Sequence, residues 1–323
     1  MVRREAPNHP YLRYWPPAPA WIVQKIFPST PCVSSLSVLT FSASPNLSMR
    51  LRLRKPAETV VTTQPEPSLP PPMESSDLAA LYRAARVGGD YFEFIPVGNS
   101  RLIFVLLDIA GRRDQALGIA ATAQKALRAA ASEKFKDVDI NEADAICDVV
   151  HNLNATILNA AGGVRCAAGF VGCYNESTGI ISYINAGHVP ALVRDGAIQV
   201  LEASGLPLGL FSHATHDPQV CALPEAGALL LASRGLLEVR AGNEEFGMDR
   251  LKESFADAPS ANAKELCSSI LRSVESFVEQ NRRRRRFGIP LQSQDGDPLS
   301  ENDITTVALI RAKAKSGAAA ASR

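Results

Sequence analysis

The sequence predicts an α+β fold, a sandwich of antiparallel sheets covered by helices. Two observations lead to this prediction. Strand-like segments come in pairs joined by short turns that contain glycine, and helix-like segments stand in separate blocks. A doubly wound parallel sheet would need regular alternation of strands and helices, which the sequence lacks. The phosphate-loop patterns G-x-x-x-x-G-K and G-x-G-x-x-G are also absent, so nucleotide-binding folds of those types are not indicated.

Hydrophobic periodicity defines the individual elements. The run "RLIFVLLDI" (101–109) predicts a buried strand with a carboxylate at its exit. Residues 166–187 and 191–201 predict two hairpins, the second turning at Asp195-Gly196, and 227–233 and 303–311 predict two further strands. Apolar residues at steps of three and four predict helices over 115–131, 143–158 and 266–277, with Asn141 as the N-cap of the second.

Composition divides the chain into three regions. Residues 1–72 are rich in Pro, Ser and Arg and lack a continuous hydrophobic pattern, so we expect a disordered, low-complexity region. Met49 or Met73 could be the true start of translation. Residues 73–311 carry all the predicted strands and helices and form the folded domain. Residues 312–323 are small and polar and predict a flexible tail.

Charge and cysteine content restrict the classes of partner and compartment. The formal net charge of +1 gives no overall field that would attract nucleic acid or an anionic membrane. No apolar run approaches the roughly 18 residues of a membrane span. Six cysteines are scattered without a C-x-x-C pair, which fits a reducing compartment. We therefore expect a cytoplasmic protein with no nucleic-acid or membrane partner.

Two carboxylates stand near the ends of successive predicted strands. Asp90 follows Gly89 in "VGGDYFEF", and Asp108 closes the strand in "LLDIAG". Two acids at one end of a sheet could hold a hard divalent cation such as Mg²⁺ or Mn²⁺. The alternative is that Asp90 caps a turn and Asp108 caps the helix that begins near Gly111.

The order of seven short blocks resembles a known family. "VGGDYFEF", "LLDIAGRR", "INAGHVPALV", "GLPLGLF", "LLLASRGLLEV", "EEFGMDRL" and "NDITTVALIR" follow one another between residues 86 and 311. This succession resembles the SpoIIE-type branch of the metal-dependent PPM serine/threonine protein phosphatases. The resemblance implies an αββα sandwich of two antiparallel sheets flanked by helices, with two Mn²⁺ or Mg²⁺ ions that activate a water for attack on phosphoserine or phosphothreonine. It does not reach residues 1–72.

The resemblance also assigns roles to individual residues. Asp90 matches the first metal-binding acid, and Asp108 matches the acid that bridges both metals, so these two are the expected catalytic and metal-binding residues. The backbone carbonyl of Ile109 is an expected further ligand. Supporting roles fall to Gly89, Asp303, Glu238 and His188. His188 could be a general acid, but its setting between Gly187 and Pro190 favours a structural role.

The sequence departs from the family at two ligand positions. Arg234 stands where the family has the aspartate of "TDG", and Asn302 stands where it has the first aspartate of "DD" before "IT". Both positions serve the same metal, so one ion or none is expected here. A guanidinium stays protonated and cannot coordinate a cation. Asp303 is not expected to replace the acid lost at position 302, because strand alternation turns its side chain to the face opposite Asn302.

These departures suggest what Arg234 does instead. We hypothesise that its guanidinium pairs with Asp108 or Asp90 and replaces the charge of one metal. The alternative is that Arg234 turns out to solvent. A separate feature, the arginine run at 282–286, fits a solvated helix end or, alternatively, a docking patch for an acidic or phosphorylated partner.

Two functions therefore stand side by side. The first is a serine/threonine phosphatase with weak activity, acting on a phosphorylated regulatory protein that resembles an anti-sigma-factor antagonist, as the family resemblance implies. The second is a catalytically inactive pseudophosphatase that serves as a signalling or binding module.

Overall fold

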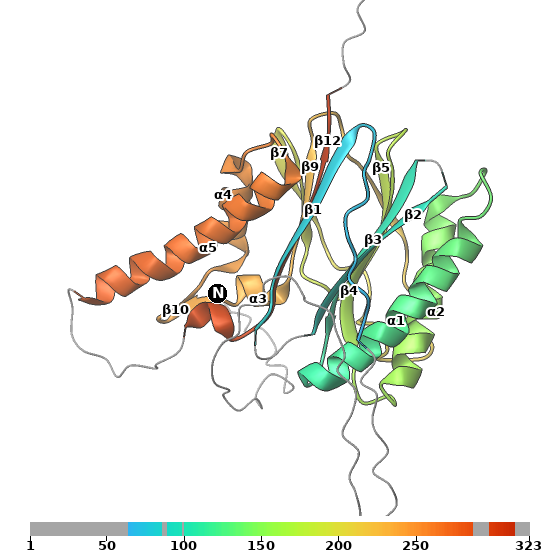
Figure 1. The fold of residues 1–323 in the computed structure, drawn as a ribbon, viewed down its shortest axis with the longest axis horizontal. Helices are drawn as coiled ribbons and strands as arrows, with labels where there is room; N and C mark the ends of the chain where they lie inside the picture. The colour runs from blue at the N-terminus through green and yellow to red at the C-terminus, as the bar shows by residue number, and fades with distance from the viewer. Residues whose placement is uncertain (1–63, 86–88, 99, 287–296, 314–323) are drawn as a thin grey trace, which may run out of the picture.

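The computed structural model describes residues 64–85, 89–98, 100–286 and 297–313 of the 323 residues. They form two antiparallel five-stranded sheets, packed face to face and enclosed by helices (Figure 1). The predicted sandwich is confirmed. Residues 1–63 of the expected disordered region, Val87 and Gly88, and tail residues 314–323 lie outside the described residues.

The first sheet has the strand order β1-β12-β9-β6-β7. Its strands are β1 (Ser76–Arg83), β12 (Ile304–Arg311), β9 (Ala228–Ala232), β6 (Ala191–Asp195) and β7 (Ala197–Leu201). Helices α4 (Gly247–Asp257) and α5 (Ala263–Arg286) cover its outer face, and the predicted helix over 266–277 lies within α5. The predicted turn between β6 and β7 is made by Gly196, whose φ of 69° favours glycine.

The second sheet has the order β2-β3-β4-β5-β8. Its strands are β2 (Asp90–Val97), β3 (Arg101–Ile109), β4 (Ala167–Asn175), β5 (Ile180–Ala186) and β8 (Gln219–Ala222). Helices α1 (Arg113–Lys134) and α2 (Glu142–Ala160) cover its outer face. The side chain of Asn141 accepts from the backbone N–H groups of Ala143 and Asp144, so the predicted N-cap of α2 is confirmed.

A layer of apolar side chains joins the inner faces of the two sheets. Phe170 stacks on Phe104 at 6.0 Å between ring centroids and on Tyr183 at 5.1 Å. Each of these rings is at least nine-tenths buried. This interior holds the sheets in one relative position, so that β2 and β3 of one sheet meet β9 and β12 of the other at a common end.

Short elements complete the end of the sandwich where the strands meet. These elements are α3 (Arg234–Leu237), the small hairpin of β10 (Arg240–Ala241) and β11 (Glu244–Glu245), and the 3₁₀ helix η2 (Pro298–Ser300). Across the described part of the chain, no helix combines the length and the apolar character needed to cross a bilayer.

The chain that leads into β1 packs as a strap on α1 and β2. The backbone N–H of Glu66 donates to Gln124 Oε1 at 2.7 Å, and Gln124 Nε2 donates back to the Glu66 carbonyl at 2.9 Å. The Phe94 N–H, on the edge strand β2, donates to Ser68 Oγ at 2.8 Å. Contacts with the folded domain therefore begin before Met73, where the sequence placed the domain boundary.

Candidate active site

Asp90 and Asp108 lie opposite each other at one end of the second sheet. Asp90 is the first residue of β2, and Asp108 is the penultimate residue of β3. The two are direct partners in the antiparallel ladder. Neither carboxylate caps α1, whose N-cap is Arg112 and has no side-chain cap bond. The structure thus brings the two acids together and contradicts the alternative in which Asp108 is a helix cap.

Gly89 lets the end of β3 approach closely. The Ile109 N–H donates to the Gly89 carbonyl at 2.9 Å. A Cβ atom at position 89 would lie 2.0 Å from the Ile109 carbonyl oxygen, which no side chain allows. Gly89 therefore supports the position of the Ile109 carbonyl, the group that the resemblance suggested as a further ligand.

Arg234 pairs with Asp108. It is the first residue of the one-turn helix α3, which follows β9 directly. Its Nη2 atom lies 3.0 Å from Asp108 Oδ2, and its Nε atom lies 3.9 Å from Glu238 Oε1. The Arg234 side chain is 56% exposed and that of Asp108 is 17% exposed, so the ion pair lies at the solvent boundary of the site. The predicted ion pair is present, and its acid is Asp108 rather than Asp90.

Asp90 sits deeper and has a different partner. Thr305 Oγ1, on β12, donates to Asp90 Oδ2 at 2.6 Å. Burial raises the pKa of Asp90 to about 8, against the Thr305 hydrogen bond, and the negative charges of Asp108 and Asp303 add to the rise. In the absence of a bound cation, this carboxyl group therefore holds its proton near neutral pH.

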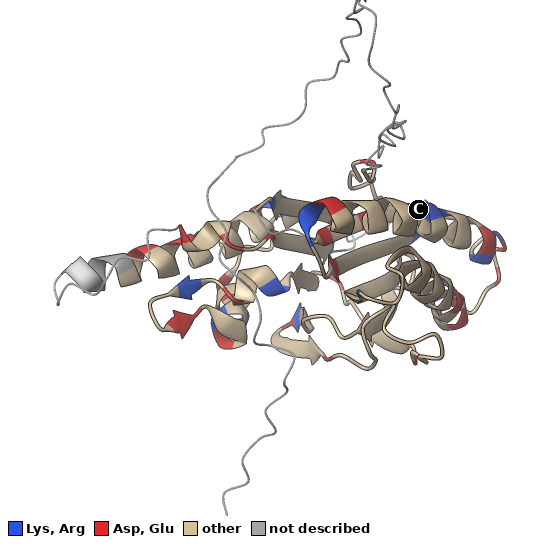
Figure 2. Ribbon diagram, turned by 90° about the horizontal axis from the view of Figure 1, so that it is seen from below, with Lys and Arg blue, Asp and Glu red and all other residues tan. Residues whose placement is uncertain are grey.

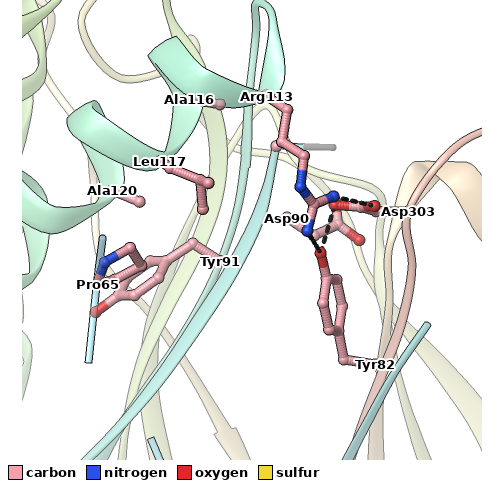
Figure 3. A pocket seen from close by; sticks show the side chains of 10 residues that line it. Pro65, Tyr82, Asp90, Tyr91, Arg113, Ala116, Leu117, Ala120 and Asp303 are labelled. Carbon is pink, nitrogen blue, oxygen red and sulfur yellow. Dashed lines mark hydrogen bonds and ion pairs between the residues drawn. The ribbon is translucent and has the colours of Figure 1, made fainter. Parts of the chain in front are cut away.

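Asp303 lies on the Asp90 side of the cluster and, as strand alternation predicts, on the side opposite Asn302. Its buried carboxylate accepts from the Tyr82 hydroxyl at 2.8 Å and from the Ala85 N–H at 2.6 Å, and lies 3.5 Å from Arg113 Nη1. Figure 3 shows Arg113 reaching toward both Tyr82 and Asp303. Burial raises the pKa of Asp303, and these hydrogen bonds oppose the rise.

Asn302 points the other way. Its Nδ2 atom donates to Glu238 Oε2 at 3.4 Å, on the side of Arg234. Consecutive residues of an extended segment face opposite sides, and the cluster is wide enough to meet both. The expected orientation of Asp303 is therefore found, and what the sequence did not indicate is that its side of the segment also borders the cluster. Burial raises the pKa of Glu238, which the charge of Arg234 opposes.

His188 is fully enclosed at the same end of the sheet. Its backbone N–H donates to Asn185 Oδ1 at 2.8 Å, and its Nδ1 lies 3.0 Å from the Val189 carbonyl. Burial lowers the pKa of the imidazole. Nε2 has no hydrogen-bond partner among the described residues. These contacts fit the structural role in a turn.

A small pocket opens beside Asp90, and sequence reasoning missed most of it. Its polar wall is formed by Tyr82, Asp90, Arg113 and Asp303, and Pro65 of the strap lies on the opposite side (Figure 3). Arg113 was visible in the block "LLDIAGRR" but carried no assigned role. Tyr82 and Pro65 lie before the first recognised block, so no motif pointed to them.

The donor set does not fit a two-metal centre. The guanidinium of Arg234 is already paired with Asp108 and cannot itself coordinate a cation, and Asn302 is turned to Glu238. Nowhere in the described ranges do three or more His, Cys, Asp or Glu side chains form a group that could hold a metal ion. The residues present instead neutralise one another by ion pairs and hydrogen bonds.

Comparison with known proteins agrees with this architecture. The family model described as stage II sporulation protein E (SpoIIE) matches residues 98–284. The chain is 36% identical over 101 residues to the phosphoserine phosphatase RsbP of Bacillus subtilis, covering 31% of this chain and 24% of that protein. It is 24% identical over 208 residues to the phosphoserine phosphatase RsbU of the same organism, covering 63% of this chain and 59% of that protein. The match thus spans about three fifths or less of these relatives' lengths.

Solved structures support the same fold. The RsbU and RsbW domains of Rv1364c from Mycobacterium tuberculosis superpose with a TM-score of 0.55 at 21% identity, over 75% of this chain and 62% of that one. The SiaA-PP2C domain of Pseudomonas aeruginosa gives a TM-score of 0.56 at 14% identity, over 72% of this chain and 85% of that one. At these identities the likeness establishes the fold alone.

Proposed function

The chain belongs to the SpoIIE family of PPM-type phosphatases, and from this premise we propose that it is a pseudophosphatase. In this proposal it no longer hydrolyses phosphoserine or phosphothreonine. It acts as a signalling module that binds a phosphorylated regulatory protein.

The observation that carries this proposal is the 3.0 Å contact between Arg234 and Asp108. A guanidinium keeps its charge at every physiological pH and has no lone pair to offer a metal. At about 4 Å and an effective dielectric near 20, it repels a divalent ion by about 8 kcal/mol before screening by salt. The ion pair therefore satisfies Asp108 and opposes the cation that this acid would otherwise bridge.

Two further contacts support the same conclusion. Asn302 offers a neutral amide where the family has an acid, and this amide bonds to Glu238. Asp303 is committed to Tyr82, Ala85 and Arg113. Neither neighbour supplies a free carboxylate to replace the lost ligands.

The proposed partner is a phosphorylated regulatory protein of the kind that antagonises an anti-sigma factor. RsbP and RsbU are named phosphoserine phosphatases, and Rv1364c joins an RsbU domain to an RsbW domain. The chain matches 24% of RsbP and 59% of RsbU.

A second candidate, residual phosphatase activity, is favoured by one observation. Asp90 and Asp108 remain direct cross-strand partners, and together they could retain a single cation. The two candidates predict different responses to manganese.

Phosphate release from a phosphoserine peptide, with and without Mn²⁺, distinguishes them. The parent chain should show little or no dependence on Mn²⁺. The double variant Arg234→Asp with Asn302→Asp restores both family ligands and should gain Mn²⁺-dependent release. The matched control, Arg272→Asp, removes an arginine of similar exposure on α5 and should behave as the parent.

Rapid Mn²⁺-dependent phosphate release by the parent chain, lost in Asp108→Ala, would establish a phosphatase and refute the pseudophosphatase. A double variant that folds and binds Mn²⁺ but stays inactive would show that more than these two ligands has been lost.

A further inference from the structure

The connection between β7 and β8 presents large apolar side chains to solvent. Leu206 is 50% exposed, Leu210 is 40% exposed and Phe211 is 46% exposed. These residues fall within the short stretch 206–211, called here the apolar loop, whose Leu208 is buried. Apolar side chains gathered on one exposed stretch commonly mark a surface that another segment or protein covers.

Buried polar side chains hold the apolar loop in place. Asn154 of α2 is 1% exposed, accepts from the Gly209 N–H at 2.7 Å and donates to the Phe211 carbonyl at 3.0 Å. The buried His216 places Nε2 2.8 Å from the Leu206 carbonyl oxygen. The backbone is therefore fixed at both ends of the apolar loop. A loop fixed in this way keeps its exposed apolar side chains outside the core.

The apolar loop lies at the same end of the second sheet as the candidate site. Leu208 exchanges two backbone hydrogen bonds of 2.8 Å with Ala167, and Ala167 pairs with Ile109 in the β3–β4 ladder. Pro65 of the strap lines the pocket beside Asp90, at the start of the neighbouring strand β2. Because adjacent strands lie about 4.8 Å apart, the strap and the apolar loop are separated by on the order of 15 Å.

The charged residues around the apolar loop are all acidic. From 195 to 233 the sequence contains Asp and Glu but neither Lys nor Arg. Glu202 and Asp217, on either side of the apolar loop, are exposed. On the described helices Lys and Arg are interspersed with Asp and Glu (Figure 2), so this acidic setting is a local feature. A segment that is both apolar and basic would complement it.

The chain ahead of the strap contains such a segment. Residues 11–27, "YLRYWPPAPAWIVQKIF", called here the tryptophan segment, hold both tryptophans of the sequence together with Arg13 and Lys25. Neither Asp nor Glu occurs from residue 6 to residue 57. About 36 residues connect this segment to the strap, a length that can bridge the distance to the apolar loop. Because both belong to one chain, they meet at a high effective concentration.

We propose that the tryptophan segment docks on the apolar loop of the same chain. Trp15 and Trp21 cover the exposed leucine and phenylalanine side chains, and the basic residues of the segment face Glu202 and Asp217. The docked segment lies beside the candidate site and excludes a partner protein from this part of the surface. The docking does not depend on whether the site hydrolyses a phosphoester, so its test and that of the proposed function can fail separately.

Tryptophan fluorescence of the full chain tests this docking, because Trp15 and Trp21 are its only tryptophans. When docked, they should emit at a shorter wavelength than in the urea-unfolded chain and be quenched less by acrylamide. Leu210→Ser combined with Phe211→Ser removes apolar contact area and should weaken docking by about tenfold or more. The emission of this double variant should therefore move toward that of the unfolded chain.

The matched control is Val138→Ser, which changes an 84% exposed apolar residue. Val138 contacts Arg101, at the opposite end of the second sheet from the candidate site, so this variant should emit as the parent does. Circular dichroism checks that each variant is folded, and sedimentation velocity reports whether the chain is a monomer.

Short-wavelength emission in a monomeric parent and in Val138→Ser, lost in the folded double variant, supports the proposal. Emission like that of the unfolded chain in the folded parent overturns it in favour of a separate partner for the apolar loop. Short-wavelength emission that persists in the double variant also overturns it, because the tryptophans then dock elsewhere. A shift that grows with chain concentration as a dimer forms assigns the apolar loop to a second copy and overturns docking within one chain.

Discussion

The buried carboxyl group of Asp90 makes the stability of the fold depend on pH. Its pKa rises from 3.8 to about 8 on folding, chiefly through burial. Between these values the folded chain keeps a proton that the unfolded chain releases. The contribution of Asp90 to the free energy of unfolding is therefore fully present below about pH 4 and is lost as the pH rises through about 8. Asp90→Asn removes this titration and leaves an amide oxygen that can still accept from Thr305.

The size of the effect follows from the proton count. One proton that only the folded state binds lowers the free energy of unfolding by about 1.4 kcal/mol for each unit of pH increase. Between pH 5 and pH 7 this amounts to roughly 3 kcal/mol. Urea unfolding in EDTA at both pH values gives this quantity for the parent and for Asp90→Asn. The parent should lose about 3 kcal/mol more than the variant over this interval.

Other groups titrate in both proteins, so the comparison between them isolates Asp90. Asp114→Asn, which removes an exposed carboxylate on α1, serves as the matched control. If the parent and Asp90→Asn lose the same free energy between the two pH values, Asp90 is ionised in the folded chain and the reasoning about its burial is refuted.

Two stability predictions concern the surroundings of the site. Arg128→Met removes the guanidinium 2.9 Å from the buried carboxylate of Glu93 and should lower the free energy of unfolding by about 2 kcal/mol. Glu66 pairs with the same arginine but is 74% exposed, so Glu66→Gln should lower it by less than about 1 kcal/mol. Equal losses would contradict this ranking. Gly89→Ala places a Cβ atom 2.0 Å from the Ile109 carbonyl oxygen and should cost about 3 kcal/mol. An unchanged urea midpoint would show that the strand end can shift freely.

The layered fold was predictable because its signals are local. The hairpin ending in Asp108 and the N-cap at Asn141 follow from periodicity and short-range hydrogen bonding. The contact between Arg234 and Asp108 was predictable for another reason. A cation at the exit of a buried strand requires an anion or water, and Asp108 ends a strand of the same domain.

What could not be predicted depends on contacts between distant segments. Asp303 meets Tyr82 and Ala85, more than 200 residues away in the sequence. Strand alternation predicts that Asp303 turns away from Asn302, but it does not show that Tyr82 and the Ala85 N–H lie on that side. The strap residue Pro65 lines the pocket beside Asp90, although low-complexity composition had assigned its region to disorder.

The central claim is that fixed positive charge has replaced a metal at Asp108. Titration of the full, unmodified chain with Mn²⁺, followed by calorimetry or by the electron paramagnetic resonance of free Mn²⁺, tests it most directly. At most one weakly held ion per chain is predicted. Two tightly bound Mn²⁺ ions per chain would contradict the account, because Arg234 could not then remain beside Asp108.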